Sequence, residues 1–184
     1  MRNHFNKVLW LRLVMGLLAL QAMLCYAELT DASKKEIVYQ MYADYKNKDF
    51  PTVTDISPQQ ATELLPMRQV VFVDTRKAVE MNVSMLPNAL TKEKFLQDSL
   101  RYKDLTVIGY CTIGYRSGLF AREMKTKGII VYNLAGGIVA WVLEGGRVFD
   151  ASGETSRVHV YGKKWNYLPA GYKPVMFGFL EKYF

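Results

Sequence analysis

The segment LTVIGYCTIGYRSGLFAREMKTKGIIVYNL, residues 105–134, decides the fold. Its first part, LTVIGY at 105–110, is apolar without polar alternation, which is typical of a strand covered on both faces. A helical pattern follows and ends at Gly128, and a second apolar run, IIVYNL at 129–134, comes after it. Strand, helix and strand at this spacing predict a βαβ unit with parallel strands.

Further segments on both sides fit the same α/β pattern. QVVFVD, at residues 69–74, is another apolar run without polar alternation and predicts a third buried strand. The end of a short strand is expected at residues 53–56, because a helix should start directly after it. Ser57 is a preferred N-cap residue, and Pro58 is preferred at the first position of a helix. After the 129–134 strand, AGGIVAWVLEGG predicts a short helix that opens on a glycine turn. These elements predict one α/β domain.

The chain carries an extension at each end of this domain. Ser33 and Glu36 have the spacing of a capping box, and apolar residues recur at helical intervals over about residues 34–47, which predicts an amphipathic helix. The C-terminal segment is dense in aromatic and turn residues and shows no clear helical period. The predicted segments are an export signal at 1–27, a helical extension at 28–50, an α/β domain at 51–150 and an aromatic tail packed on that domain at 151–184.

Residues 1–27 have the composition of an export signal. Arg2, Lys7 and Arg12 come with no acidic residue, and the apolar stretch at 13–27 ends in a small residue. This stretch of 15 residues is shorter than the roughly 20 that a membrane-spanning helix needs. We therefore predict a cleaved signal and no stable membrane insertion, with an uncleaved anchor as the alternative. The protein is expected to be exported, to the periplasm if the source is bacterial and otherwise into the secretory pathway or onto a membrane anchor.

The charge distribution argues against nucleic acid as a partner. The chain has 24 Lys and Arg and 17 Asp and Glu, a net charge of +7. Removing residues 1–27 removes three cations and no acid, so residues 28–184 have a net charge of +4. The remaining lysines are scattered and do not gather with aromatic residues into one strip. These charges are expected to form an ordinary solvated surface.

Cys111 is the only cysteine outside the predicted signal, so residues 28–184 cannot form an intramolecular disulfide. It directly follows the 105–110 strand, at the edge where parallel sheets bind ligands. Gly114 would ease a tight loop in which backbone N–H groups, the helix N-terminus and Arg116 surround an anion. Such surroundings stabilise a thiolate, so the pattern predicts a nucleophile. A small buried cysteine that only fills the core is the alternative.

Several separated motifs occur in the order found in one family. VFVDTRKAVEMNVSMLPNAL at 71–90 and VIGYCTIGYRSGLFAREMKTKGIIVYNLAGGIVAW at 107–141 resemble the rhodanese-like domains, and the resemblance covers about residues 53–148. It implies an α/β fold with a five-stranded, mostly parallel sheet and helices on both faces. It also implies transfer of a sulfur atom through a cysteine persulfide, with no cofactor.

The resemblance further implies the roles of individual residues. It makes Cys111 and Arg116 the catalytic residues, at the two ends of a six-residue loop. Related phosphatases have a loop one residue longer that ends in arginine, and Ser117 at that position favours sulfur chemistry. The loop residues that the resemblance assigns to substrate binding are Thr112, Ile113, Gly114, Tyr115 and Ser117.

Asp74 and Arg76 match an Asp-x-Arg motif of the family and are expected to be structural residues near the site. A buried charge needs a partner, and we expect Arg76 to pair with Glu80. His159 is the only histidine outside the predicted signal, so no histidine cluster is available for zinc and no metal is expected. A catalytic pair of His159 with Cys111 is the less favoured alternative.

The expected function is that of a sulfurtransferase. Cys111 would take the outer sulfur of thiosulfate or of a persulfide donor and pass it to cyanide or to a thiol, including a protein thiol. Thr112 stands where many thiosulfate sulfurtransferases have a basic residue, so a persulfide is expected to be the better donor. Two alternatives stay open: phosphatase or arsenate reductase chemistry on the same scaffold, and a non-catalytic binding or sulfur-carrier module.

Five aromatic residues near the C-terminal side of the domain have two candidate roles. Aromatic side chains at this density are expected to pack in the core. The alternative is that they line the mouth of the site or bind a partner. The five are Trp141, Tyr161, Trp165, Tyr167 and Tyr172.

Overall fold

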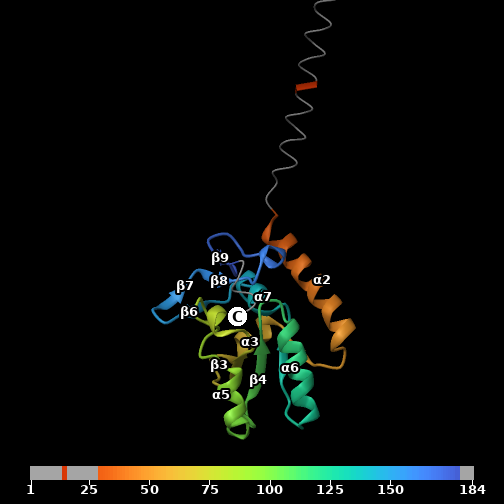
Figure 1. Ribbon diagram of the computed structural model, residues 1–184, viewed down its shortest axis with the longest axis vertical. Coiled ribbons are helices and arrows are strands. Elements are labelled where there is room, and N and C mark those ends of the chain that lie inside the picture. Colours follow the sequence, from red (N-terminus) through yellow and green to blue (C-terminus); the bar gives the residue numbers. More distant parts are fainter. Residues whose placement is uncertain (1–13, 16–28, 179–184) are drawn as a thin grey trace, which may run out of the picture. The chain divides into compact units, whose positions relative to one another are not determined.

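The structure is a computed structural model that describes residues 14–15 and 29–178 (Figure 1). The chain divides into two compact units, Met1–Thr30 and Asp31–Phe184, and the second contains the sheet. The predicted export signal at residues 1–27, and the alternative of an anchor, lie outside the described residues apart from 14–15. Within the described ranges, no helix has both the length and the apolar character needed to cross a membrane.

A five-stranded parallel sheet forms the centre of the second unit, as the resemblance implied. β2 and β4 pair along their whole length, from Val70 opposite Thr106 to Asp74 opposite Tyr110. β4 is the central strand, so its carboxyl end is flanked by a neighbour on each side. In spatial order the strands are β1 (Asp55–Ile56), β5 (Tyr132–Leu134), β4 (Thr106–Tyr110), β2 (Val70–Asp74) and β3 (Leu90–Thr91).

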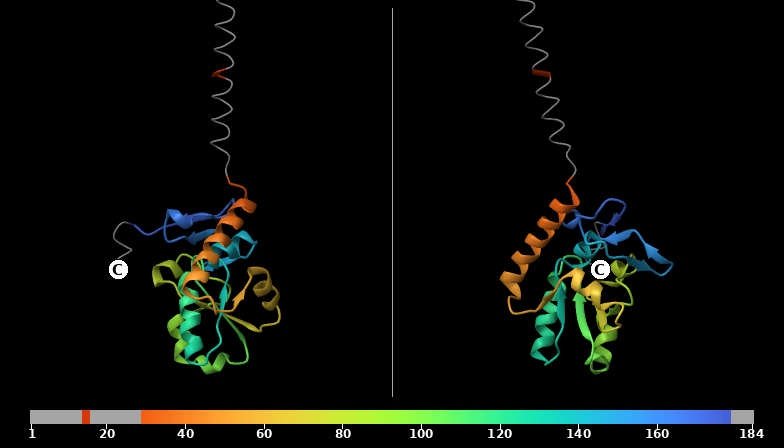
Figure 2. Two further views of the ribbon diagram at one scale, coloured as in Figure 1. Left: turned by 90° about the vertical axis from the view of Figure 1, so that its right-hand side faces the viewer. Right: turned by 180° about the vertical axis from the view of Figure 1, so that it is seen from behind.

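Helices cover both faces of the sheet (Figures 1 and 2). Successive side chains of β2 point to opposite faces, so Phe72 joins one apolar cluster while Val71 and Val73 join the other. The first cluster includes residues of α3 and α7, and the second includes residues of α5 and α6. Two covered faces explain why the strand sequences lack polar alternation. These helices span Pro58–Leu64 (α3), Lys92–Gln97 (α5), Tyr115–Thr126 (α6) and Gly137–Leu143 (α7).

The local signals for helix starts are confirmed at one place and wrong at another. Ser57 caps α3 through a capping box with Gln60, and Pro58 is the first helical residue, as predicted. The predicted N-terminal helix is present as α2 (Asp31–Asp49), which contacts α6 and α7. It begins two residues before Ser33, so the predicted cap at Ser33 is wrong. Two shorter helices are α4 (Ala78–Met81) and η1 (Ser99–Tyr102).

β5 is shorter than the strand predicted at 129–134. The Ile129 N–H donates to the Met124 carbonyl at 3.0 Å and closes the C-terminal end of α6. Strand pairing begins only at Tyr132, opposite Ile108 of β4. The first half of the predicted strand is therefore wrong, because its backbone completes the helix end instead of the sheet.

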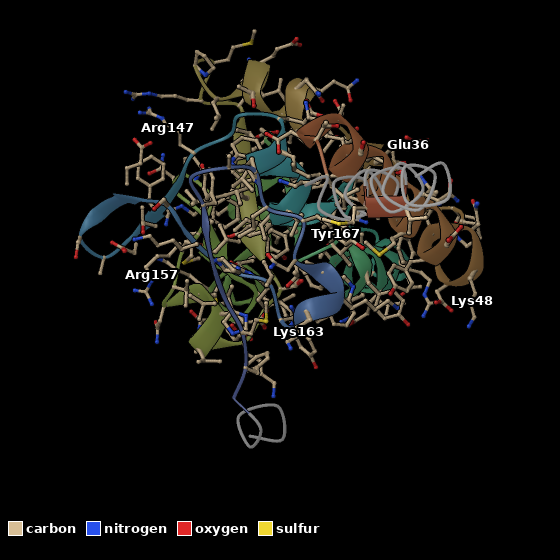
Figure 3. The ribbon with its side chains drawn as sticks, turned by 90° about the horizontal axis from the view of Figure 1, so that it is seen from above. Glu36, Lys48, Arg147, Arg157, Lys163 and Tyr167 are labelled. Atoms are coloured by element: carbon tan, nitrogen blue, oxygen red, sulfur yellow. The ribbon has the colours of Figure 1, made fainter. Side chains whose placement is uncertain are left out.

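The C-terminal segment forms two small sheets that lie over α7 and the upper end of the main sheet (Figures 1 and 3). The domain boundary predicted at residue 150 falls within the hairpin of β6 and β7. Val158 and Val160 are fully buried in the main core, so this segment belongs to the compact unit. Its elements are β6 (Val148–Asp150), β7 (Gly153–Thr155), β8 (Arg157–His159), η2 (Lys163–Trp165) and β9 (Lys173–Val175).

Candidate active site

Cys111 lies directly after the central strand. β4 ends at Tyr110, and α6 begins at Tyr115, so Cys111 opens a short loop between the strand and a helix N-terminus. Gly114 is the N-cap of α6 and has a φ of 91°, in the left-handed region that glycine adopts without steric cost. A Cβ at this position would meet the ring of Tyr42 at 2.7 Å. The turn from strand to helix therefore depends on a glycine at position 114.

The carbonyl groups of this loop are held by neighbouring elements. The Cys111 carbonyl accepts from the Ile138 N–H at 2.9 Å, and the Thr112 carbonyl accepts from the Val139 N–H at 3.2 Å. In a trans peptide the N–H points opposite to the carbonyl, so the N–H groups of Thr112 and Ile113 point away from α7. In the part of the chain that the structure describes, no backbone carbonyl accepts from the N–H groups of residues 112–117. The loop thus presents unpaired donors next to the start of a helix, which is suited to an anion.

Arg116 is held by a buried carboxylate. Its two terminal nitrogens each donate to Glu80 at 2.7 Å, and Nη2 also donates to Thr112 Oγ1 at 3.2 Å. Glu80 accepts further hydrogen bonds from the Thr112 hydroxyl at 3.3 Å and from the Lys77 N–H at 3.0 Å. Burial alone would raise the pKa of Glu80, but the hydrogen bonds and charge of Arg116 outweigh it and hold this pKa below its ordinary value.

The Glu80 carboxylate also shifts the pKa of Arg116. Burial lowers the pKa of the Arg116 guanidinium, but the hydrogen bonds that it donates to Glu80 and the negative charge of Glu80 together raise this pKa above its ordinary value. The guanidinium therefore stays charged and paired with the Glu80 carboxylate, and it lines the same pocket as Cys111.

Cys111 lines a pocket of about 280 Å³. One wall comes from the loop, and the opposite wall comes from the C-terminal segment. The Arg116 Cζ lies 5.4 Å from the centre of the Tyr161 ring, a cation–π distance, and Tyr161 meets Trp165 edge to face at 5.3 Å. The pocket is therefore largely aromatic and apolar around one thiol and one guanidinium. Its lining residues are Cys111, Thr112, Ile113, Tyr115, Arg116, Tyr161 and Trp165.

The structure divides the five aromatic residues between the two roles weighed from the sequence. Trp141 is buried in the core, where its ring lies 5.4 Å from that of Phe72. Tyr167 and Tyr172 are partly buried and pack against the same core. Tyr161 and Trp165 line the pocket, which was the alternative.

Residues 57–144 match the family model described as Rhodanese-like domain. The chain contains a rhodanese-like domain. Among curated proteins, a tRNA uridine(34) hydroxylase of Corynebacterium kroppenstedtii is 36% identical over 101 residues, which cover 48% of this chain and 34% of that protein. A second, from Corynebacterium urealyticum, is 34% identical with the same coverage. The chain thus spans about a third of the length of these relatives.

One of two solved structures compared with this chain supports the same fold. Thiosulfate sulfurtransferase from Pseudomonas aeruginosa superposes with a TM-score of 0.51 at 19% identity, over 74% of this chain and 26% of that one. A rhodanese-like domain protein from Staphylococcus aureus gives a TM-score of 0.43 at 26% identity, over 48% of this chain and 91% of that one. At 19% identity, the first likeness concerns the fold.

Asp74 and Arg76 form a fully buried pair in the rhodanese-like domain. The Arg76 Nε donates to both Asp74 oxygens, at 2.9 and 3.1 Å, and Nη2 donates to Asp74 at 2.7 Å and to the Ser84 carbonyl at 2.5 Å. The expected pairing of Arg76 with Glu80 is therefore wrong. Asp74 is only two residues away and binds the Nε and Nη2 of Arg76, while Nη1 has no hydrogen-bond partner among the described residues and Glu80 pairs with Arg116. The Asp74–Arg76 pair ties the end of β2 to the segment that follows α4.

His159 supports the pocket wall of the rhodanese-like domain. It is buried, its Nδ1 accepts from the Tyr161 N–H at 3.1 Å, and its ring meets Phe177 at 4.4 Å. The same nitrogen lies 3.9 Å from a Glu80 oxygen. Because Nδ1 accepts a hydrogen bond, that nitrogen carries no proton in this arrangement. Within residues 14–15 and 29–178, no group of three or more His, Cys, Asp or Glu side chains is placed to hold a metal ion.

Three residues that sequence reasoning did not assign to the site brace the loop of the rhodanese-like domain from the side of α2. The buried Asn133 amide donates to the Gly114 carbonyl and to the Tyr42 hydroxyl, each at 2.9 Å. Tyr42 in turn donates to Asp55 at 2.5 Å, and burial together with this bond raises its pKa above the ordinary value. The one signal in the sequence is a polar Asn133 near the end of an apolar run, a position where a buried amide needs partners.

Proposed function

We propose that this protein is a sulfurtransferase that carries sulfane sulfur as a persulfide on Cys111. The observation that carries the proposal is the anchoring of the Cys111 and Thr112 carbonyls by α7, which leaves the loop N–H groups free beside the thiol. N–H donors at a helix start stabilise the anions that sulfur transfer creates, first a thiolate and then a persulfide. The match of residues 57–144 to the rhodanese-like domain supports the same chemistry.

The reaction has two balanced steps. In the first, the Cys111 thiolate attacks the outer sulfur of a persulfide, R–S–SH, forming an S–S bond to Cys111 and releasing the R–S⁻ thiolate. In the second, the Cys111 persulfide loses a proton, and an acceptor thiolate or cyanide attacks its terminal sulfur. The S–S bond to Cys111 breaks, which restores the Cys111 thiolate. The transferred sulfur leaves as a new persulfide when the acceptor is a thiolate and as thiocyanate when it is cyanide. No step needs an outside oxidant or reductant. Arg116 and the loop N–H groups hold the negative sulfur in both steps.

The pocket favours a donor with an apolar body over thiosulfate. Four of its lining side chains are apolar or aromatic, and the charge of Arg116 is compensated by Glu80. Thr112 supplies a hydroxyl where a cation would attract a dianion. An organic persulfide releases a monoanionic thiolate and gains from contact with Tyr161 and Trp165. The acceptor is a thiol of comparable size or a protein thiol that reaches the pocket mouth.

Intact-mass measurement tests the proposal. Protein treated with an organic persulfide and then freed of it should gain one sulfur atom, and Cys111→Ser should gain none. Adding cyanide should remove the sulfur and release thiocyanate in repeated turnovers. Sulfur uptake without release would identify a carrier module, and turnover of p-nitrophenyl phosphate without sulfur uptake would identify phosphatase chemistry. Either result would overturn the sulfurtransferase proposal.

A further inference from the structure

Arg116 is the only side chain with a fixed charge among the described residues that line the Cys111 pocket. Its side chain is 30% exposed, whereas the Glu80 side chain behind it is completely buried and does not line the pocket. The two groups meet through two hydrogen bonds of 2.7 Å. A ligand in the pocket therefore meets a cation whose charge is compensated by Glu80, a residue that does not line the pocket.

The groups around Glu80 leave this cancellation intact. Besides Arg116, the carboxylate receives the Thr112 hydroxyl and the Lys77 backbone N–H, and both of these are uncharged. His159 faces it at 3.9 Å through Nδ1, which accepts the Tyr161 N–H and is therefore unprotonated. Since Arg76 is paired with Asp74, the charge of Glu80 is opposed mainly by Arg116.

We propose that Glu80 is a specificity-determining residue that neutralises Arg116 and so makes the pocket discriminate against strongly anionic donors such as thiosulfate. This assignment deepens the proposed function and rests on it for the identity of the donor. The charge effect itself concerns only the thiol and its surroundings. Glu80 also fixes the guanidinium in place, so it acts on the ligand through Arg116 and is a positioning residue as well.

Two alkylating agents of similar size measure the pocket charge without any sulfur transfer. Iodoacetate is an anion and iodoacetamide is neutral, and both react with the Cys111 thiolate. The ratio of their rate constants cancels changes in thiol ionisation, because both agents need the same thiolate. The Glu80→Gln and Arg116→Gln variants and their combination form a cycle in which the local charge is raised by one, lowered by one and restored.

We expect the iodoacetate-to-iodoacetamide ratio to rise about tenfold in Glu80→Gln, to fall about tenfold in Arg116→Gln, and to return to within about threefold of wild type in the double variant. Glu123→Gln removes an acid from the exposed Glu123–Lys127 pair at the C-terminal end of α6 and should leave the ratio unchanged. A folded Glu80→Gln protein with the wild-type ratio would overturn the inference. If Glu80→Gln does not fold, an unchanged ratio in Arg116→Gln overturns it.

A donor comparison then connects the charge to specificity. Glu80→Gln should raise the kcat/KM for the thiosulfate dianion, relative to that for an organic persulfide that carries at most one negative charge, by about tenfold. If Cys111 takes up sulfur from neither donor, the proposed function fails, while the alkylation ratios still decide the role of Glu80. If sulfur is taken up and the relative preference does not move, the specificity role of Glu80 is wrong and the sulfurtransferase proposal stands.

Discussion

Substitution of Gly137 by alanine tests whether α7 shapes the Cys111 loop. Gly137 opens α7 with a φ of 60°, and a Cβ there would lie 2.4 Å from the Cys111 carbonyl oxygen and 2.8 Å from Gly114 N and Thr112 C. All three atoms belong to the backbone of the loop, so no flexible side chain can move aside. The loop itself has to shift, and the bonds from Ile138 and Val139 that orient its carbonyls are disturbed with it.

The cost has two parts. Alanine in the left-handed region costs roughly 1–2 kcal/mol, and forcing extra volume into a packed site costs typically about 1–3 kcal/mol. We therefore expect Gly137→Ala to lower the free energy of unfolding by about 2–5 kcal/mol. Gly145 provides the matched control, because its φ is 87° and a Cβ there meets nothing within 4 Å. Gly145→Ala should show only the first part, about 1–2 kcal/mol.

Urea unfolding followed by far-UV circular dichroism gives both free energies. Intact-mass kinetics of sulfur uptake at Cys111, in buffer where both variants are folded, gives the effect on the loop. We expect the uptake rate to fall at least about tenfold in Gly137→Ala, equivalent to about 1.4 kcal/mol in the barrier, and to stay near wild type in Gly145→Ala. Equal destabilisation by the two substitutions, or unchanged uptake in Gly137→Ala, would refute the argument that α7 holds the loop in its active shape.

Three further outcomes are expected. Trp165→Ala removes part of the outer pocket wall, so kcat/KM for an organic persulfide should fall about tenfold while that for thiosulfate changes little; equal losses would mean that the wall only supports the fold. Asp74→Asn leaves Arg76 buried without a counter-charge and should cost about 3–5 kcal/mol in urea unfolding; a loss below about 1 kcal/mol would show the pair to be replaceable. In the folded protein the pKa of Glu80 is held below its ordinary value of 4.5, so the ionised carboxylate stabilises the fold above pH 4.5. This stabilisation is lost as the pH falls from 4.5 through the lowered pKa of the folded state. Unfolding of Glu80→Gln should therefore depend less on pH below 4.5 than that of wild type, and parallel profiles would contradict the coupling to Arg116.

The parts of the fold that local rules determine could be predicted from the sequence. The apolar runs at 69–74 and 105–110 became the adjacent interior strands β2 and β4, because a strand covered on both faces needs apolar residues at every position. β3 has only two residues, Leu90 and Thr91, which is too short for any period, and it exists because β2 pairs with it. β8 and β9 likewise depend on a non-local pairing in which Val158 lies opposite Pro174.

The site, like the fold, has features that follow from neighbouring residues and features that depend on distant ones. The position of Cys111 after a strand and the need for Gly114 at the turn follow from neighbouring residues, so the sequence indicates both. The partner of Glu80 does not follow from neighbouring residues, since its partner Arg116 is 36 residues away and the unused Arg76 is only four away. The choice depends on Asp74, which pairs with Arg76 and leaves Glu80 to pair with Arg116. Competition between two buried acids for two arginines is decided by three-dimensional placement, which sequence spacing does not contain.

The two extensions outside the predicted 51–150 domain both contribute residues around the site. On the side of α2, Tyr42 packs against the turn at Gly114 and bonds to Asn133, so it holds the loop that carries the nucleophile. In the C-terminal extension, Tyr161 and Trp165 line the pocket that a donor would enter under the proposed function. Under the proposed function, the strand and the helix starts determine where the sulfur would react, while the tail and the buried acid behind Arg116 would govern which donor reaches it. Substitutions in the tail should therefore change donor preference while the thiol remains able to accept sulfur.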